Sequence, residues 1–367
     1  MKILIATGIF PPEIGGPATY AALLRDELEK RGDKVIVLAF REVRRHSRWL
    51  RHLIYFSRIL KEGRTSDLIF TQDTISTGFP SVMAAFFLRK KVVMRVAGDH
   101  AWEQAQQQYK VTDSIDEFQT KKYSLKIELM RSIQRYSVRH ADVVITPSNY
   151  FSALVSGWLQ NTREVKTIYN GIDLTVEFEK ELKFPELTII SAGRLVPWKG
   201  FDTLIDALSE MPRWKLLIAG DGPDKERLRA IAAEKGVADR VTFLGQISRP
   251  ELFAVIHRSH ICALLSTFES FSFQIVEAMH VGVPVIASDI GNLEEIIETG
   301  KNGVLIDPHD TAAFVVEAER VAGDHTYERM LSLNAQKRAG DFSIKKTLDE
   351  LYKVFLEVVE VKPHKTL

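Results

Sequence analysis

The chain has 367 residues, which suits two domains, and 45% of them are apolar and 26% charged, as in ordinary globular proteins. Its 49 lysines and arginines are balanced by 48 aspartates and glutamates, which argues against a protein built to bind nucleic acid. The single cysteine, Cys262, excludes an internal disulfide and a cysteine-based zinc site, and it suits a reducing cytoplasm.

The N-terminal half alternates short apolar runs with helical patterns. Its opening run is too short for a secretory signal, and no later window is long enough to cross a membrane, so we expect a cytoplasmic protein. A helix is predicted at Ala18–Arg31. Apolar runs separated by helices are typical of buried parallel strands, and these are predicted at Lys2–Ala6, Lys34–Phe40, Asp67–Thr71, Lys91–Val96 and Asp142–Thr146.

Residues 170–185 lack a convincing strand pattern and are interpreted as a linker. A second alternating series follows, with strands predicted at Thr188–Ala192, Lys215–Ala219, Arg240–Leu244, Ile261–Leu265, Pro284–Ala287 and Gly303–Ile306. The sequence therefore predicts an α/β protein with two doubly wound, Rossmann-like domains, 1–172 and 173–344, facing a central cleft. An amphipathic helix at Ser343–Val361 comes last, and residues 345–367 could pack on either domain, a return to the first being one option.

Ligands of such folds bind at the carboxyl ends of the strands, where the N-termini of helices present free N–H groups. The first strand-to-helix turn contains Gly15 and Gly16, which would let the backbone approach an anion or would simply form a tight turn. The turn GRLVPWKG at 193–200 places Arg194 and Lys199 between two glycines. These cations could clamp a diphosphate, or they could belong to a solvated basic loop.

Two glutamates flank the start of a helix that is predicted near Phe271. Glu269 precedes the helix, and Glu277 follows eight residues later within an apolar run. A buried carboxylate is costly without hydrogen-bond donors, and the hydroxyls of a sugar or a ribose are suitable donors. A structural ion pair would explain one of these glutamates, but it would not explain both beside a basic clamp.

Six segments stand in order along the chain: GGPATY at 15–20, NGID at 170–173, GRLVPWKG at 193–200, GDGP at 220–223, ESFSFQIVEAMHVGVPVIAS at 269–288 and GNLEEIIETGKNGVLIDP at 291–308. Together they resemble the motifs of glycosyltransferase family 4. The resemblance covers nearly the whole chain, and the two glutamates separated by seven residues are its most specific part. It implies the GT-B fold and a retaining enzyme that uses a nucleoside-diphosphate sugar.

The resemblance also implies roles for individual residues. Arg194 and Lys199 would bind the diphosphate. Glu277 would bind the ribose hydroxyls, and Glu269 would contact the transferred sugar. Further donor contacts would come from turn and backbone positions, with the stretch Gly245–Ile247 against the nucleobase: Gly15, Gly16, Gly193, Asp221, Gly245, Gln246, Ile247, Phe271 and Ser272. The family usually has a glycine in place of Ser272, a change that a backbone contact survives.

One departure concerns the histidine that the family commonly places near the sugar. This chain reads VAGDHAWEQ after the fourth predicted strand, so either Asp99 or His100 occupies that position. Trp102 and Glu103 would help to shape the acceptor pocket. No Asp-x-Asp motif stands at a plausible strand end, so we expect cations, rather than a metal ion, to neutralise the diphosphate, and we expect no bound cofactor.

Residues 41–64 carry eight arginines or lysines and two glutamates, a local charge of +6. Trp49, Leu53, Phe56 and Leu60 follow helical spacing within this segment. Such a helix could rest on an anionic membrane surface, which would favour a lipid-linked or cell-envelope acceptor and a peripheral position at the inner face of the membrane. Alternatively, the apolar stripe packs on the sheet and the arginines are solvated.

The sequence therefore predicts a metal-independent, retaining hexosyltransferase of polysaccharide or glycolipid synthesis. A UDP-sugar is the favoured donor and a GDP-sugar the second option, with a glycan or lipid-linked acceptor and no nucleic acid as partner. The alternatives are a sugar-nucleotide epimerase or a phosphorylase of the same fold, and a non-catalytic subunit that binds nucleotide sugars. An NAD dehydrogenase would need a Gly-x-Gly-x-x-Gly turn after the first strand, and the sequence has none there.

Overall fold

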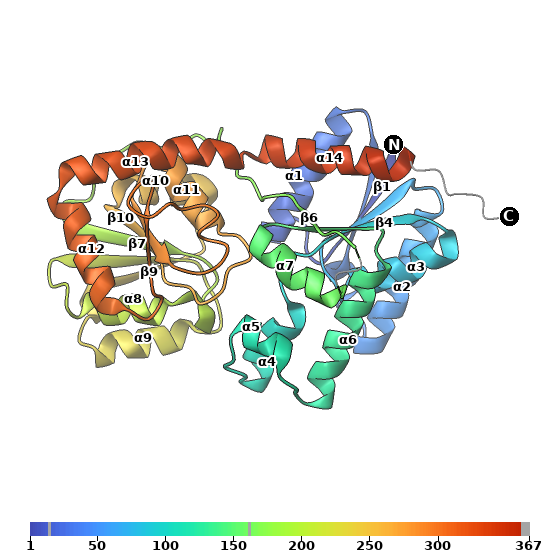
Figure 1. Cartoon of the computed structure of the whole chain (residues 1–367), viewed down its shortest axis with the longest axis horizontal. Coiled ribbons are helices and arrows are strands. Elements are labelled where there is room, and N and C mark those ends of the chain that lie inside the picture. The colour runs from blue at the N-terminus through green and yellow to red at the C-terminus, as the bar shows by residue number, and fades with distance from the viewer. Residues whose placement is uncertain (14–15, 161–162, 361–367) are drawn as a thin grey trace. The chain divides into compact units, whose positions relative to one another are not determined.

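The computed structural model describes residues 1–13, 16–160 and 163–360, without the side chains of Arg48 and Trp49. Internal contacts divide the chain into two compact units, Met1–Tyr169 with the segment from Leu348 onward, and Asn170–Thr347. Each unit is built on a parallel β-sheet with helices against it (Figure 1). The predicted α/β class with two doubly wound domains is confirmed.

The first unit holds a six-stranded parallel sheet in the order β2-β1-β3-β4-β5-β6. Consecutive residues of its central strands, such as Ile3 and Leu4, are fully buried although they point to opposite faces, so both faces are covered. The strands are β1 (Lys2–Thr7), β2 (Lys34–Ala39), β3 (Leu68–Thr71), β4 (Lys91–Arg95), β5 (Val143–Thr146) and β6 (Lys166–Thr167). The sequence analysis missed β6, because two half-buried residues carry no readable pattern.

The helices of the first unit connect these strands. They are α1 (Gly16–Lys30), α2 (Arg48–Gly63), α3 (Gly78–Leu88), α4 (His100–Tyr109), α5 (Ile115–Thr120), α6 (Leu125–His140) and α7 (Asn149–Trp158). Strands β1 and β3 are neighbours in the sheet. The chain continues from β1 to β2 on one side of this pair and from β3 to β4 on the other side. The loops after β1 and β3 therefore flank the switch point of this sheet, which is where α/β proteins bind ligands.

The last helix, α14 (Ile344–Glu360), belongs to the first unit from Leu348 onward. Phe355 is fully buried, and its ring meets the edge of Phe70 from β3 at 5.4 Å between centroids. Lys166 of β6 donates to Glu357 at 2.6 Å. The end of the chain therefore contributes a helix to the core of the unit in which the chain begins.

The second unit begins with the Asn170-Gly171 pair because this segment packs on residues near position 343. The N–H of Ile172 donates to the carbonyl of Phe342 at 2.9 Å. A Cβ atom on Gly171 would lie 2.4 Å from the carbonyl carbon of Ser343, so only glycine permits this approach. From Asp173 to Glu186 the chain forms neither helix nor strand.

The second sheet also has six parallel strands, in the order β12-β11-β10-β7-β8-β9. The strands are β7 (Leu187–Ala192), β8 (Trp214–Ala219), β9 (Val241–Gly245), β10 (Ile261–Leu264), β11 (Val285–Ser288) and β12 (Val304–Ile306). When the strands are numbered 1 to 6 within the unit and read from β9 to β12, this is the 3-2-1-4-5-6 order of dinucleotide-binding domains. Its switch point lies between β7 and β10.

The helices of the second unit cover this sheet and bury a core that includes Phe201, Trp214 and Phe314. They are α8 (Phe201–Leu208), α9 (Lys225–Glu234), α10 (Arg249–Arg258), α11 (Phe273–Val281), α12 (Thr311–Gly323) and α13 (His325–Ala339). Among the described residues of the chain, no helix is long and apolar enough to cross a lipid bilayer.

The basic segment 41–64 forms a short 3₁₀ turn and then α2, so the predicted helix is confirmed. The side chains that it turns toward the sheet are Tyr55 and Ile59, which are fully buried; the Tyr55 hydroxyl donates to the carbonyl of Leu38 at 2.8 Å. The alternative in which the whole apolar stripe packs on the sheet is wrong at Leu53, which is 64% exposed. The side chain of Trp49 lies outside the described residues.

Candidate functional site

The loops after β7 and β10 meet at the switch point of the second sheet. The N–H of Thr267 donates to the carbonyl of Trp198 at 2.9 Å. Gly200 has φ +66°, and a Cβ atom there would lie 1.9 Å from the carbonyl oxygen of Leu265. A glycine is therefore required where the two loops touch, and it brings the loop 193–200 against the end of β10.

This contact places Lys199 beside Glu269. The Lys199 ammonium lies 2.5 Å from Glu269 Oε1, and the same oxygen accepts a 2.8 Å hydrogen bond from the Ser266 hydroxyl. Glu269 is only 6% exposed. A carboxylate with so little water around it needs such donors, and here a predicted diphosphate-binding cation and a predicted sugar-binding carboxylate neutralise each other.

Glu277 lies on α11 and is also 6% exposed. Its Oε1 accepts from the guanidinium of Arg249, the first residue of α10. Burial raises the pKa of Glu277, and the charge of Arg249 opposes that rise. The sequence analysis missed Arg249, because 28 residues separate the partners and no local spacing reveals the pair. The only available signal was the need of a buried carboxylate for a cation.

The helix α11 begins between Glu269 and Glu277 in the sequence. Ser272 caps the helix, and its hydroxyl accepts from the N–H of Ile275 at 3.4 Å. The ring of Phe271 is buried against Phe273 and Phe342, with centroids at 5.5 and 5.8 Å. Since the Phe271 side chain belongs to the core, only its backbone can serve a ligand.

The remaining donor-side candidates lie in the turns after β7, β8 and β9. Gly193 and Gly220 approach so closely that a Cβ on Gly220 would lie 1.9 Å from the Gly193 carbonyl oxygen. The Gly220 N–H donates to the carbonyl of Gly245 at 2.7 Å, so these three turns lie together at one edge of the sheet. The Asp221 carboxylate accepts from the N–H of Gly222 at 2.8 Å, which is ordinary turn chemistry.

Three further candidates lie along this edge and differ in exposure. The side chains of Arg194 and Gln246 are exposed, and that of Ile247 is half-buried. The structure thus brings Lys199 together with Glu269 and places the glycine turns side by side.

In the first unit, Asp99 and His100 stand at the carboxyl end of β4. Asp99 is 1% exposed and caps α4: it accepts from the N–H of Trp102 at 3.0 Å and from the amides of Gln134 and Gln119 at 3.0 and 2.9 Å. His100 is the first residue of α4 and is partly exposed. The carboxylate therefore stabilises the start of the helix, whereas His100 is partly exposed.

The other candidates of the first unit have simpler positions. Gly16 begins α1 and is exposed, whereas Gly15 lies outside the described residues. Trp102 is buried, with its indole N–H donating to the carbonyl of Asp113 at 3.0 Å, so it belongs to the core and not to an open pocket. Glu103 is half-buried.

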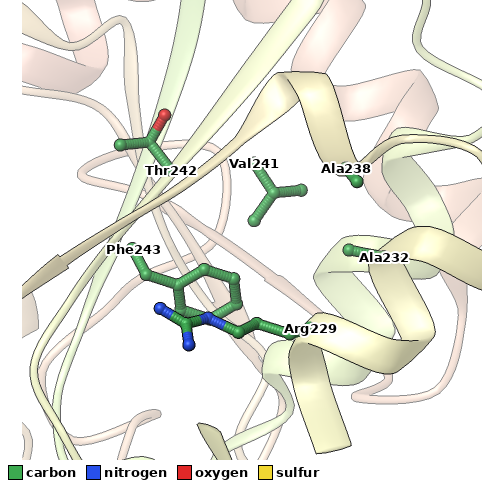
Figure 2. A pocket seen from close by; sticks show the side chains of 6 residues that line it. All are labelled: Arg229, Ala232, Ala238, Val241, Thr242 and Phe243. Atoms are coloured by element: carbon green, nitrogen blue, oxygen red, sulfur yellow. The ribbon is translucent and has the colours of Figure 1, made fainter. Parts of the chain in front are cut away.

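A surface hollow of about 360 Å³ lies elsewhere in the second unit, between α9 and β9 (Figure 2). Its lining residues are Arg229, Ala232, Ala238, Val241, Thr242 and Phe243, and none of the predicted site residues is among them. The Arg229 guanidinium lies over the Phe243 ring at 5.6 Å. The hollow begins at the amino end of β9, opposite to the edge where α/β proteins bind ligands, so we do not assign the donor site to it.

The described residues contain no group of three or more histidine, cysteine, aspartate or glutamate side chains that could hold a metal ion.

Two family models together match residues 14–338 of the chain. The model described as glycosyl transferases group 1 matches residues 175–338, and the model described as glycosyltransferase family 4 matches residues 14–176. An uncharacterized glycosyltransferase of Methanocaldococcus jannaschii is 29% identical over 260 residues, which are 65% of this chain and 66% of that protein. A D-inositol 3-phosphate glycosyltransferase of Mycolicibacterium smegmatis is 35% identical over 171 residues, 43% of this chain and 37% of that protein. The chain thus matches less than two thirds of the length of these curated relatives.

Solved structures resemble the chain over nearly its whole length. Sucrose-phosphate synthase from Thermosynechococcus elongatus has a TM-score of 0.79 at 20% identity, and the match covers 99% of this chain and 100% of that chain. Anabaena HepE, solved in complex with UDP-glucose, has a TM-score of 0.75 at 22% identity and covers 97% of this chain and 100% of its own. These likenesses show that the fold is GT-B.

Proposed function

Because the chain belongs to the group 1 glycosyltransferases of family 4, we propose that it transfers a sugar from a nucleoside-diphosphate sugar to a hydroxyl acceptor. The transfer retains the anomeric configuration and uses a hexose. UDP is the favoured nucleotide, which the UDP-glucose complex of the similar HepE supports, and GDP is the second option. The acceptor is a glycan or a lipid-linked molecule, and the enzyme works in the cytoplasm at the inner face of a membrane.

One observation carries this proposal: two buried carboxylates, each paired with a cation, belong to the segment that follows β10, a strand at the switch point of a sheet with dinucleotide-binding topology. Lys199, in the loop after β7, pairs with Glu269, in the loop after β10. Arg249 on α10 pairs with Glu277 on α11. A nucleoside-diphosphate sugar offers what these groups need, because it has anionic phosphates for Lys199 and hydroxyls for the carboxylates.

Donor binding then exchanges partners at Lys199. The diphosphate draws the ammonium away from Glu269, which is left buried with the Ser266 hydroxyl as a donor. The sugar hydroxyls replace the lost ammonium and donate to Glu269. The ion pair therefore keeps both groups oriented before the donor arrives, and the donor satisfies both when it binds.

The chemistry needs charge placement more than covalent help from the protein. The bond from the anomeric carbon to the leaving diphosphate breaks, and the acceptor oxygen bonds to that carbon on the same face. The acceptor proton passes to an oxygen of the leaving diphosphate. Arg194, Lys199 and the N-terminus of α11 stabilise the growing negative charge, and each group of this kind contributes about 3 kcal/mol in a closed site.

In the first unit we assign the sugar-side role to His100 and not to Asp99. Both oxygens of Asp99 accept hydrogen bonds within the protein, so this carboxylate serves the start of α4. His100 follows directly and is partly exposed. Asp99 thus acts as a positioning residue for the helix that carries His100.

Thermal unfolding with UDP, GDP, ADP or NAD, each with and without EDTA, tests the donor site. A ligand at 100 times its dissociation constant adds about 2.7 kcal/mol of stability. We expect a shift with one nucleoside diphosphate that is insensitive to EDTA, weakened in Lys199→Ala and kept in Lys215→Ala. Lys215 is a matched control because it also pairs with a glutamate, at 2.8 Å, but on the exposed part of β8. Stabilisation by NAD alone would overturn the proposal.

Product analysis separates transfer from the alternatives. A transferase releases the free nucleoside diphosphate, whereas an epimerase converts one nucleotide sugar into another and releases none. We expect Lys199→Ala to reduce nucleotide release by about 10²–10³-fold, the usual cost of losing one stabilising donor. Binding of a nucleotide without any turnover would favour the non-catalytic subunit.

A further inference from the structure

Helices α2 and α3 expose large apolar side chains on the outside of the first unit. Leu50 is 47% exposed, Leu53 64%, Phe86 77% and Phe87 63%. We call these four side chains the α2–α3 surface. Single exposed apolar residues are ordinary, but two adjacent phenylalanines that are both mostly exposed are not.

The α2–α3 surface is continuous and rigidly mounted. The Phe87 ring meets the edges of Phe86 and of Phe56 on α2, with centroids at 5.5 and 6.3 Å. Beneath it, Tyr55 and Ile59 of α2 are fully buried against the sheet. The middle of α2 therefore has apolar side chains both toward the sheet and toward solvent, and only those toward the sheet belong to the core.

Positive charge surrounds the α2–α3 surface. Residues 48–64 and 78–90, which hold both helices and their C-terminal ends, contain seven arginines and lysines and one glutamate. Four of these cations follow the apolar side chains at the ends of the helices: Lys61, Arg64, Arg89 and Lys90. None of the four takes part in the ion pairs formed by the described residues. Their charge is therefore available to an anionic partner.

We propose that the α2–α3 surface binds the anionic face of a lipid bilayer. Phenylalanine and leucine side chains enter the region between headgroups and acyl chains, while the lysines and arginines remain among anionic headgroups. A second copy of the chain fits less well, because a two-fold contact through this surface would place its cations opposite one another. The surface does not depend on the donor site, but its link to a lipid-linked acceptor rests on the proposed function.

Sedimentation of the full chain with vesicles tests the surface. Vesicles of phosphatidylcholine with phosphatidylglycerol are compared with vesicles of phosphatidylcholine alone, at low and high salt. The double variant Phe86→Ser/Phe87→Ser removes the exposed rings, and Lys61→Glu/Arg89→Glu reverses two charges. Val316→Ser/Leu333→Ser is the matched control, since these side chains are 64% and 56% exposed but lie on α12 and α13 of the other unit.

We expect the wild type to bind the anionic vesicles at low salt, with at least tenfold weaker binding in both surface variants and none lost in the control. Equal binding to neutral vesicles, no binding at all, or full binding by the phenylalanine variant would overturn the proposal. A dimer that the phenylalanine variant abolishes, without vesicle binding, would assign the surface to a second copy. The shift in thermal unfolding with a nucleoside diphosphate is recorded for every variant, so that loss of the donor site is recognised separately.

Discussion

Arg249 is the residue whose replacement tests the role of charge at the proposed donor site. Arg249→Met leaves Glu277 buried without its cation, and the pKa of Glu277, which burial already raises, then rises further. In its proposed role Glu277 accepts hydrogen bonds from ribose hydroxyls, and the ionised carboxylate accepts them better than the neutral carboxyl, because a charged acceptor forms stronger hydrogen bonds. We therefore expect affinity for the nucleoside diphosphate to fall as the pH is lowered from 8 to 6, and to fall more steeply in Arg249→Met than in the wild type.

The same substitution changes the pH dependence of stability. A carboxyl group whose pKa is higher in the folded than in the unfolded state favours folding at low pH, and this contribution is lost as the pH rises through the folded pKa. We expect Arg249→Met to lose about 2 kcal/mol near neutral pH, less than a fully buried pair costs because Arg249 is 28% exposed, and to recover part of it near pH 5. Denaturant titrations at both pH values measure this. Arg249→Lys should restore much of the affinity. The same pH dependence of affinity in all three proteins would disprove the idea that the charge of Arg249 keeps Glu277 ionised.

The pair Asp99 and His100 allows structure and chemistry to be tested at adjacent residues. Asp99→Asn turns one acceptor oxygen into a donor that faces another donor, so we expect a loss of about 2 kcal/mol in the free energy of unfolding. His100→Ala should change that free energy by less than about 0.5 kcal/mol, because the side chain is partly exposed. Turnover should instead fall by about 10²-fold. Urea titrations and initial rates measure both, and a stable Asp99→Asn with low activity would reverse the assignment.

At the scale of elements, Gly200 is the point at which two loops of the proposed donor site touch. Gly200→Ala places a methyl group 1.9 Å from the carbonyl oxygen of Leu265, and we expect a loss of about 3 kcal/mol or more together with weaker nucleotide binding. Gly236→Ala is a matched control because Gly236 has the same φ of +66° but nothing within 4 Å of an added Cβ. It should cost only about 1 kcal/mol and leave nucleotide binding intact. Equal effects of the two substitutions would show that φ alone matters.

All the strands except β6 were predictable, because a buried parallel strand is a largely continuous apolar run. The same property hides how a helix divides its apolar residues. In α2 the sequence indicated one stripe, but Tyr55 faces the sheet and Leu53 faces solvent. Spacing alone cannot separate two apolar faces of one helix, because the number of partners available to bury them depends on the neighbouring elements.

At the scale of the whole molecule, the chain order of the motifs was enough to predict the fold class and the two sheets. The order of strands within each sheet was not predictable from it, and that order is what places the turns after β7 and β10 at a switch point. Contacts between residues far apart in sequence were equally hidden. Arg249 with Glu277 is one such contact, and Phe355 with Phe70 is another.

We expect the two units to unfold in separate transitions. Each unit has its own sheet and core, so calorimetry of the full chain should resolve two transitions, and a bound nucleoside diphosphate should raise only the transition of the second unit. Phe355→Ala removes a fully buried ring from the first unit and should lower the other transition, by about 3–5 kcal/mol in free energy. Leu356→Ala on the same helix is the matched control, since Leu356 is 36% exposed and should cost much less. A single transition that responds to both the nucleotide and Phe355→Ala would mean that the units unfold together, and α14, which continues from one unit into the other, would then be the element that couples them.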